Sequence, residues 1–142
     1  MSKEVKILVV EDNLADAKLI LRGLKQFKFT NQAIHVSCAN DAIKFLTNQS
    51  PYEISQLPDL IFLDLNLPDM YRIDLLTYIK GRDELKHIPV IILSHSNSKN
   101  DILNSYQNYA NCYINKSDDL KGLVEIFQKL ENFWFTIVKM PC

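Results

Sequence analysis

The chain has 142 residues, close to the usual size of one domain, and 47% of them are hydrophobic, which argues against disorder. The formal net charge of −1 argues against a nucleic-acid surface held by bulk positive charge. Only a short apolar run, 7–10, precedes two acids near the N-terminus. We therefore expect no signal peptide and no membrane span, and a cytoplasmic location.

Two kinds of apolar stretch alternate along the first half of the chain. Short runs rich in β-branched residues predict strands at 6–10, 33–39 and 59–63. Runs with helical spacing follow each strand. The second helix opens at Asn40-Asp41, and the third contains 74–79. The first helix has its apolar face at Leu14, Ala17, Ile20, Leu21, Leu24 and Phe27.

The same alternation continues in the second half. A strand at 89–93 precedes a helix over 97–109, in which Ile102, Leu103 and Tyr106 are expected to face inward. A strand at 112–115 precedes a long helix at about 117–138. Five such units predict an α/β fold with a parallel sheet, covered on both faces because its strands are continuously apolar. The longest loop candidate, 47–58, lies inside the alternation, so we expect one domain over 1–142.

Polar residues follow four of the five predicted strands. Asp64 interrupts the apolar run 60–67, where a carboxylate is costly unless it is paired or coordinated. In open parallel sheets, sites form beyond the carboxyl ends of the strands. We therefore expect three carboxylates, one hydroxyl and one ammonium to meet at one edge. These groups belong to Glu11, Asp12, Asp64, Ser94 and Lys116.

The charges of this cluster indicate its chemistry. Three carboxylates close together raise one another's pKa, so a cationic group must offset them. Lys116 supplies one positive charge, and oxygen ligands with few protein contacts suit Mg²⁺. A metal and an ammonium together attract a phosphoryl group. Asp64, on the central strand, is then the best-placed nucleophile and would form an aspartyl-phosphate.

The segments VVEDN, LIFLDLNLP, IPVIILS and CYINK resemble, in order and spacing, the receiver domain of two-component response regulators. The resemblance covers essentially the whole chain and implies a doubly wound, flavodoxin-like sheet of five strands in the order 2-1-3-4-5, with five helices. The later segments NCYINKSDDL and IFQKLENFWF are similar, more narrowly, to single-domain regulators paired with cyanobacterial phytochromes.

The receiver resemblance implies a role for each residue of the predicted cluster. Asp64 would be the phosphoacceptor, taking its phosphoryl group from a phosphohistidine on a sensor histidine kinase, here a phytochrome-like one. Lys116 and Ser94 would contact that group, and Tyr113 would be the aromatic switch that turns inward when Ser94 moves. The protein would assist this transfer and its own slow dephosphorylation, without being an enzyme for another substrate.

The resemblance also implies a Mg²⁺ site. Asp12 would bind the metal directly, Glu11 through water, and Asn66 through its backbone carbonyl, beside Asp64. Glu11 stands where the family more often has Asp. Tyr71-Arg72 replaces the usual Asp-Gly pair, so this loop can be reshaped. Ser117 replaces the usual proline after Lys116, which leaves open whether the Lys116-Ser117 bond is cis.

Other interpretations stay open at this point. A phosphatase of the haloacid dehalogenase type needs a second Asp where Asn66 stands, and a docking module could have lost phosphorylation. A flavodoxin-like FMN binder fits poorly, because Glu11-Asp12 occupy the phosphate-binding turn. We expect His95 to be structural or solvent-facing. The aromatic cluster 133–135 predicts a homodimer through the C-terminal strand-helix face.

Overall fold

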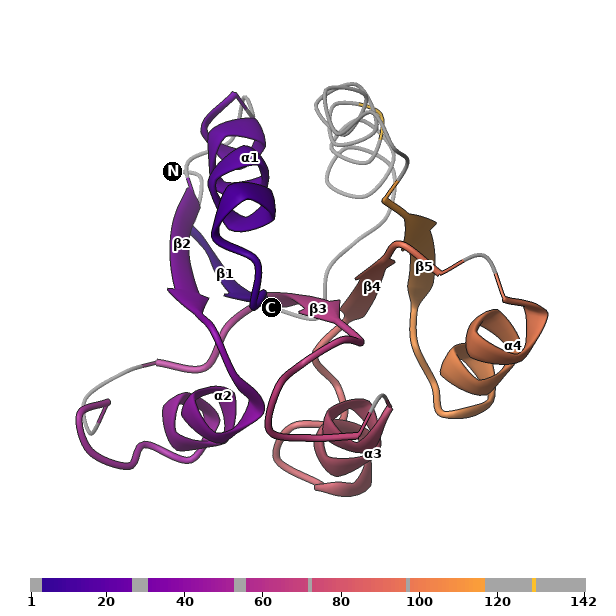
Figure 1. Cartoon of the computed structure of the whole chain (residues 1–142). Helices are drawn as coiled ribbons and strands as arrows, with labels where there is room; N and C mark the ends of the chain where they lie inside the picture. The colour runs from indigo at the N-terminus through magenta and orange to yellow at the C-terminus, as the bar shows by residue number, and fades with distance from the viewer. Residues whose placement is uncertain are drawn as a thin grey trace.

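The computed structural model describes residues 4–26, 31–52, 56–71, 73–96, 98–116 and 129. Its strands form one sheet in the order β2-β1-β3-β4-β5, and every neighbouring pair is parallel. This arrangement confirms the predicted doubly wound α/β fold (Figure 1). The elements are, in chain order, β1 (Val5–Val10), α1 (Leu14–Lys25), β2 (Asn31–Val36), α2 (Ala39–Leu46), β3 (Leu60–Asp64), α3 (Asp74–Gly81), β4 (Val90–Ser94), α4 (Lys99–Gln107) and β5 (Cys112–Asn115).

Four of the five predicted helices lie in the described ranges, and the fifth, expected at about 117–138, falls outside them. The aromatic cluster 133–135 and the Lys116-Ser117 bond also fall outside the described residues. None of the helices within the described ranges has the length and hydrophobicity that crossing a membrane requires.

Both faces of the sheet are covered, which explains why its inner strands are apolar throughout. Figure 1 shows α1 on one face and α2 and α3 on the other. Successive strand residues point to opposite faces. In β1, for example, Ile7 and Val9 pack in the core cluster that includes Ile20 and Leu24 of α1. Leu8 and Val10 join the opposite cluster with the residues of α2 and α3.

The second strand ends earlier than predicted. β2 covers Asn31–Val36 rather than 33–39, because Cys38 is the N-cap of α2 and has extended backbone. The Cys38 side chain makes no capping hydrogen bond. Instead, the Asp69 carboxylate accepts the backbone N–H groups of Ala39 and Asn40, both at 2.8 Å. The helix start is therefore satisfied by a residue from the β3–α3 loop.

The predicted inward face of α4 is wrong for two of its three residues. Leu103 and Tyr106 are exposed, and Ile102 is half-buried. Ser105 is the buried residue of this helix. Its hydroxyl donates to the carbonyl of Asp101 at 2.8 Å, so a small polar side chain can face the sheet with its hydrogen bond satisfied inside the helix.

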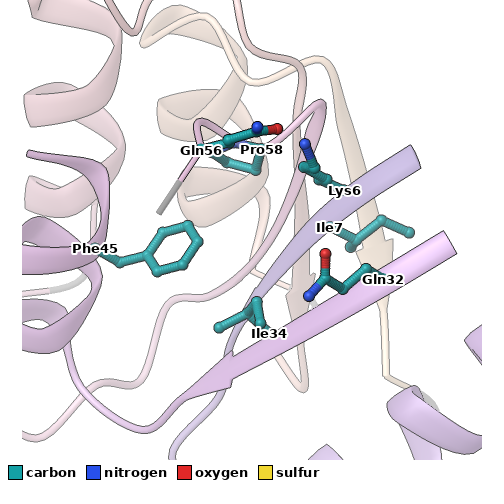
Figure 2. Close-up of a pocket in the computed structure, with 7 residues that line it drawn as sticks. All are labelled: Lys6, Ile7, Gln32, Ile34, Phe45, Gln56 and Pro58. Carbon is teal, nitrogen blue, oxygen red and sulfur yellow. The ribbon is translucent and has the colours of Figure 1, made fainter. Parts of the chain in front are cut away.

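A cavity of about 290 Å³ opens near the amino-terminal ends of the strands (Figure 2). Its apolar lining includes Phe45 of α2 and Ile34 of β2, and Lys6 of β1 lies at its polar side. This cavity is at the opposite end of the strands from the polar residues described next.

Candidate functional site

Three of the predicted site residues meet at the carboxyl edge of the sheet. Val10 pairs with Leu63, so Glu11 leaves β1 level with Asp64, the last residue of β3. Lys116 follows β5, and its backbone N–H donates to the carbonyl of Ser94 at 2.6 Å. The Lys116 Nζ forms ion pairs with the Glu11 carboxylate and, at 3.7 Å, with Oδ2 of Asp64. The ammonium is therefore shared between strand ends that are far apart in the sequence.

Strand alternation decides on which face each polar side chain lies. Asp64 continues the series Leu60 and Phe62, which packs on the α1 face. Glu11 and Lys116 continue the same-face series of β1 and β5. Ser94, in contrast, continues the series Val90 and Ile92 of the opposite face. The charged group therefore gathers on the α1 face of the sheet edge, and the predicted hydroxyl comes from the other side.

Burial and charge perturb the titration of this cluster. Burial, and next the adjacent Asp64 carboxyl, raise the pKa of Glu11 to about 7, against the opposing effect of Lys116. Burial by itself lowers the pKa of Lys116, but the hydrogen bond to Glu11 and the charge of Asp64 outweigh it, so the pKa is raised. The lysine therefore stays protonated, and Glu11 exchanges its proton near neutrality.

Asp16 belongs to the same cluster, although its sequence position did not point to it. Its Oδ2 lies 3.1 Å from the Lys116 Nζ. The predicted apolar face of α1 began at Leu14, but Leu14 is 65% exposed and Asp16 only 6%. Asp16 has the spacing of Ile20 and Leu24, the residues that face the sheet. The sequence feature that could have identified Asp16 is an acidic residue on the apolar face of an amphipathic helix.

His95 also contacts this cluster. Its Nδ1 lies 3.0 Å from the carbonyl oxygen of Lys116, and its Nε2 lies 3.2 Å from Oδ2 of Asp16. The side chain remains 51% exposed. His95 was expected to be structural or solvent-facing, and its ring is both half-exposed and in contact with two residues of this cluster.

The remaining predicted metal ligands, Asp12 and Asn66, come two residues after the ends of β1 and β3. Asp12 and Asn66 are exposed, and the backbone N–H of Asn66 donates to Oδ1 of Asp64 at 3.1 Å. Glu11 Oε2 accepts the backbone N–H of Asn13 at 3.2 Å. The donors are all oxygens, which fits a hard divalent cation. Among the described residues, however, no three His, Cys, Asp or Glu side chains already form a metal-binding group.

Ser94 and Tyr113 flank the loop between β4 and α4. Ser94 is buried, and its Oγ accepts the backbone N–H of Ser96 at 3.0 Å. The Tyr113 hydroxyl donates to the carbonyl of Ser96 at 2.9 Å, and Asn115 Nδ2 donates to the same oxygen at 3.2 Å. The predicted hydroxyl and the predicted aromatic switch therefore bind the same short loop from two sides.

The family model for the response regulator receiver domain matches residues 7–128. The chain therefore belongs to this family and is a two-component response regulator. It is 40% identical over 135 residues to the response regulator Rcp1 of Synechocystis, covering 95% of this chain and 92% of Rcp1. These findings give no support to the phosphatase interpretation.

Two solved structures share both the fold and the sequence. The Mn²⁺-bound form of Rcp1 has a TM-score of 0.90 at 39% identity, covering 97% of this chain and 99% of that chain. The phosphorylated cyanobacterial phytochrome response regulator RcpA has a TM-score of 0.93 at 38% identity, covering 99% of this chain and 100% of that chain. The narrower resemblance to cyanobacterial phytochrome regulators is thereby confirmed as a similarity.

Proposed function

We propose that Asp64 is the phosphoacceptor of this response regulator. A carboxylate oxygen of Asp64 would attack the phosphorus of a phosphohistidine on a sensor histidine kinase. The P–N bond breaks, its electron pair returns to the imidazole, and an acyl phosphate forms on Asp64. The observation that carries the proposal is a buried carboxylate at the end of the central strand, with the Lys116 ammonium 3.7 Å away.

The same proposal assigns the other side chains. Lys116 would neutralise oxygens of the incoming phosphoryl group, because its ammonium is already held at the nucleophile. Glu11, Asp12, Asp64 and the Asn66 backbone carbonyl would hold Mg²⁺. When bound, that ion supplies positive charge to the transferred group. The Mg²⁺ assignment is supported by the all-oxygen donor set and by the Mn²⁺ bound in the Rcp1 structure.

The response would travel through Ser94 and Tyr113. If Ser94 turns its hydroxyl toward a phosphoryl group on Asp64, the hydrogen bond from Ser96 N–H to its Oγ is lost. The same loop also accepts the Tyr113 hydroxyl at the Ser96 carbonyl. A shift of this loop therefore releases Tyr113 and changes the surface of β5 and α4, which is a two-state element biased by new charge.

The proposed setting is cytoplasmic, with a phytochrome-like kinase as the partner. The support for this partner is the similarity to RcpA, which is itself a phytochrome response regulator. We also propose a homodimer through the C-terminal strand-helix face, on the basis of the aromatic cluster 133–135.

Labelling with a small phosphodonor such as acetyl phosphate tests the proposal. The wild-type protein with Mg²⁺ should retain about one phosphate per chain, because an acyl phosphate on one residue is the product. Asp64→Asn should retain none, and chelation of the metal should abolish labelling of the wild type. A folded wild-type protein that takes no label would contradict the phosphoacceptor role, and many released phosphates per chain would indicate a phosphatase.

A further inference from the structure

Lys116 is held by more than the two strand-end acids. Its ammonium, in a residue only 2% exposed, is closer to Asp16 Oδ2, at 3.1 Å, than to Asp64 Oδ2, at 3.7 Å. An ammonium has three N–H donors, and three carboxylates surround this one. Asp16 therefore takes one donor of the lysine from the helix side, away from the predicted nucleophile.

His95 holds both ends of this contact. One ring nitrogen lies against the backbone carbonyl of Lys116, and the other lies against the Asp16 oxygen that accepts the ammonium. Both partners are oxygen atoms that accept hydrogen bonds, so a ring N–H of His95 has an acceptor on either side of the ring. His95 thus links the lysine backbone to the acid that holds the lysine's side chain.

We propose that Asp16 and His95 are positioning residues that hold the Lys116 ammonium beside Asp64 at a distance longer than a direct hydrogen bond. Oδ2 of Asp64 is then not held by a direct hydrogen bond from the ammonium, while the ammonium stays within reach of the phosphoryl oxygens. Without Asp16, the lysine would lose one of its three anchors and bind Asp64 directly or tilt away from it. Either shift misplaces a group that must be aligned in the transition state.

The inference rests on the proposed phosphoacceptor role, and one set of labelling experiments separates the two. Labelling of the wild type and its loss in Asp64→Asn test the role itself. The second-order rate constant for acetyl phosphate is then measured for Asp16→Asn, His95→Gln and the double variant. We expect Asp16→Asn to slow labelling by up to about 10²-fold, the effect of misplacing a group that must be aligned in the transition state by about 1 Å.

Coupling between the two residues is the decisive readout. If His95 acts through Asp16, the double variant should label as slowly as Asp16→Asn alone, rather than showing the product of the two effects. His95→Arg, which presents several N–H donors to the same two oxygens, should restore most of the rate lost in His95→Gln. His87→Gln is the matched control, because His87 is exposed and precedes β4 at the other edge of the sheet.

Thermal unfolding of each variant separates positioning from folding. Should Asp16→Asn fail to fold, the half-exposed His95 still tests the proposal through the Gln and Arg variants. Wild-type rates in both Asp16→Asn and His95→Gln would overturn the inference while leaving the phosphoacceptor role intact. Independent, multiplicative effects would also overturn it, because they would mean that His95 does not act through Asp16.

Discussion

The Glu11 carboxyl is buried between Asp64 and Lys116, at 1% exposure, so removal from solvent, and next the Asp64 carboxyl, raise its pKa. The three carboxylates around one ammonium leave an excess of negative charge in the metal-free protein. Protonation of Glu11 relieves part of this excess. The same excess is what a divalent cation would neutralise, so proton and metal should compete for this cluster.

The raised pKa of Glu11 predicts a pH dependence of stability in the metal-free protein. Because the pKa is about 7 in the folded protein and 4.5 in the unfolded chain, the stabilising contribution of protonated Glu11 is complete below about pH 4.5 and lost as the pH rises through 7. Glu11→Gln imitates the protonated form. With EDTA present, urea unfolding should show this variant matching wild type at pH 5 and exceeding it at pH 8 by on the order of 2 kcal/mol. An unchanged difference across this pH range would contradict the assignment.

At the scale of elements, the β3–α3 loop stabilises a helix to which it is not adjacent in the sequence. The Asp69 carboxylate accepts hydrogen bonds from two backbone N–H groups at the start of α2. Its negative charge lies at the positive end of the helix dipole, which is favourable. Burial alone would raise the pKa of Asp69, but the bonds from Asn40 and Ala39 outweigh it and lower the pKa. The loop after the proposed phosphoacceptor is thereby fixed to the neighbouring helix.

Removing this cap should cost stability. Asp69→Ala leaves two N–H groups of α2 without their acceptor, so we expect a loss of about 1 kcal/mol in the free energy of unfolding. Chemical denaturation in urea measures it. Asp83→Ala is the control, because Asp83 is an exposed acid whose salt bridge to Lys86 lies on the surface. Equal effects of the two substitutions would show that Asp69 is not a cap.

At the scale of the whole molecule, the two ends of the parallel strands differ in chemistry. The carboxyl ends of the strands hold the buried charges, and the 290 Å³ cavity lies at the other end, lined by residues of β1, β2, α2 and the segment before β3 (Figure 2). Between them, α4 beside β5 exposes Leu103, Tyr106 and the following Tyr109. A signal that starts at Asp64 and moves the β4–α4 loop would reach this surface first, because the loop leads directly into α4.

The proposed homodimer makes a prediction about the molecular mass. Light scattering should report about twice the 16.5 kDa chain mass for the wild type, and Trp134→Ala should shift it toward one chain. Tyr71→Ala serves as the control, because Tyr71 is an aromatic residue exposed at 73% and lies on the β3–α3 loop. The same mass for wild type and Trp134→Ala would remove the case for self-association through the aromatic cluster.

The sequence by itself determined the order of the elements and the edge at which the polar residues meet. Alternating apolar runs indicated a parallel sheet, and the position of Asp64, Glu11 and Lys116 at strand ends placed them together. These predictions were possible because the apolar runs of strands and the spacing of helices can each be recognised within a single segment of the chain. The boundaries of β2 were less predictable, because the cap of α2 comes from Asp69 in another loop.

Only the tertiary structure decided which further residues join the site. Asp16 has the spacing of the buried face of α1, but the sequence could not show that this face rests against the end of β5. His95 follows β4, and its ring finds Asp16 and the Lys116 carbonyl only after α1 has packed on the sheet. The physical reason is that the two contacts of Asp16, with His95 and with Lys116, join residues 79 and 100 positions apart, and their pairing depends on helix packing rather than on local pattern.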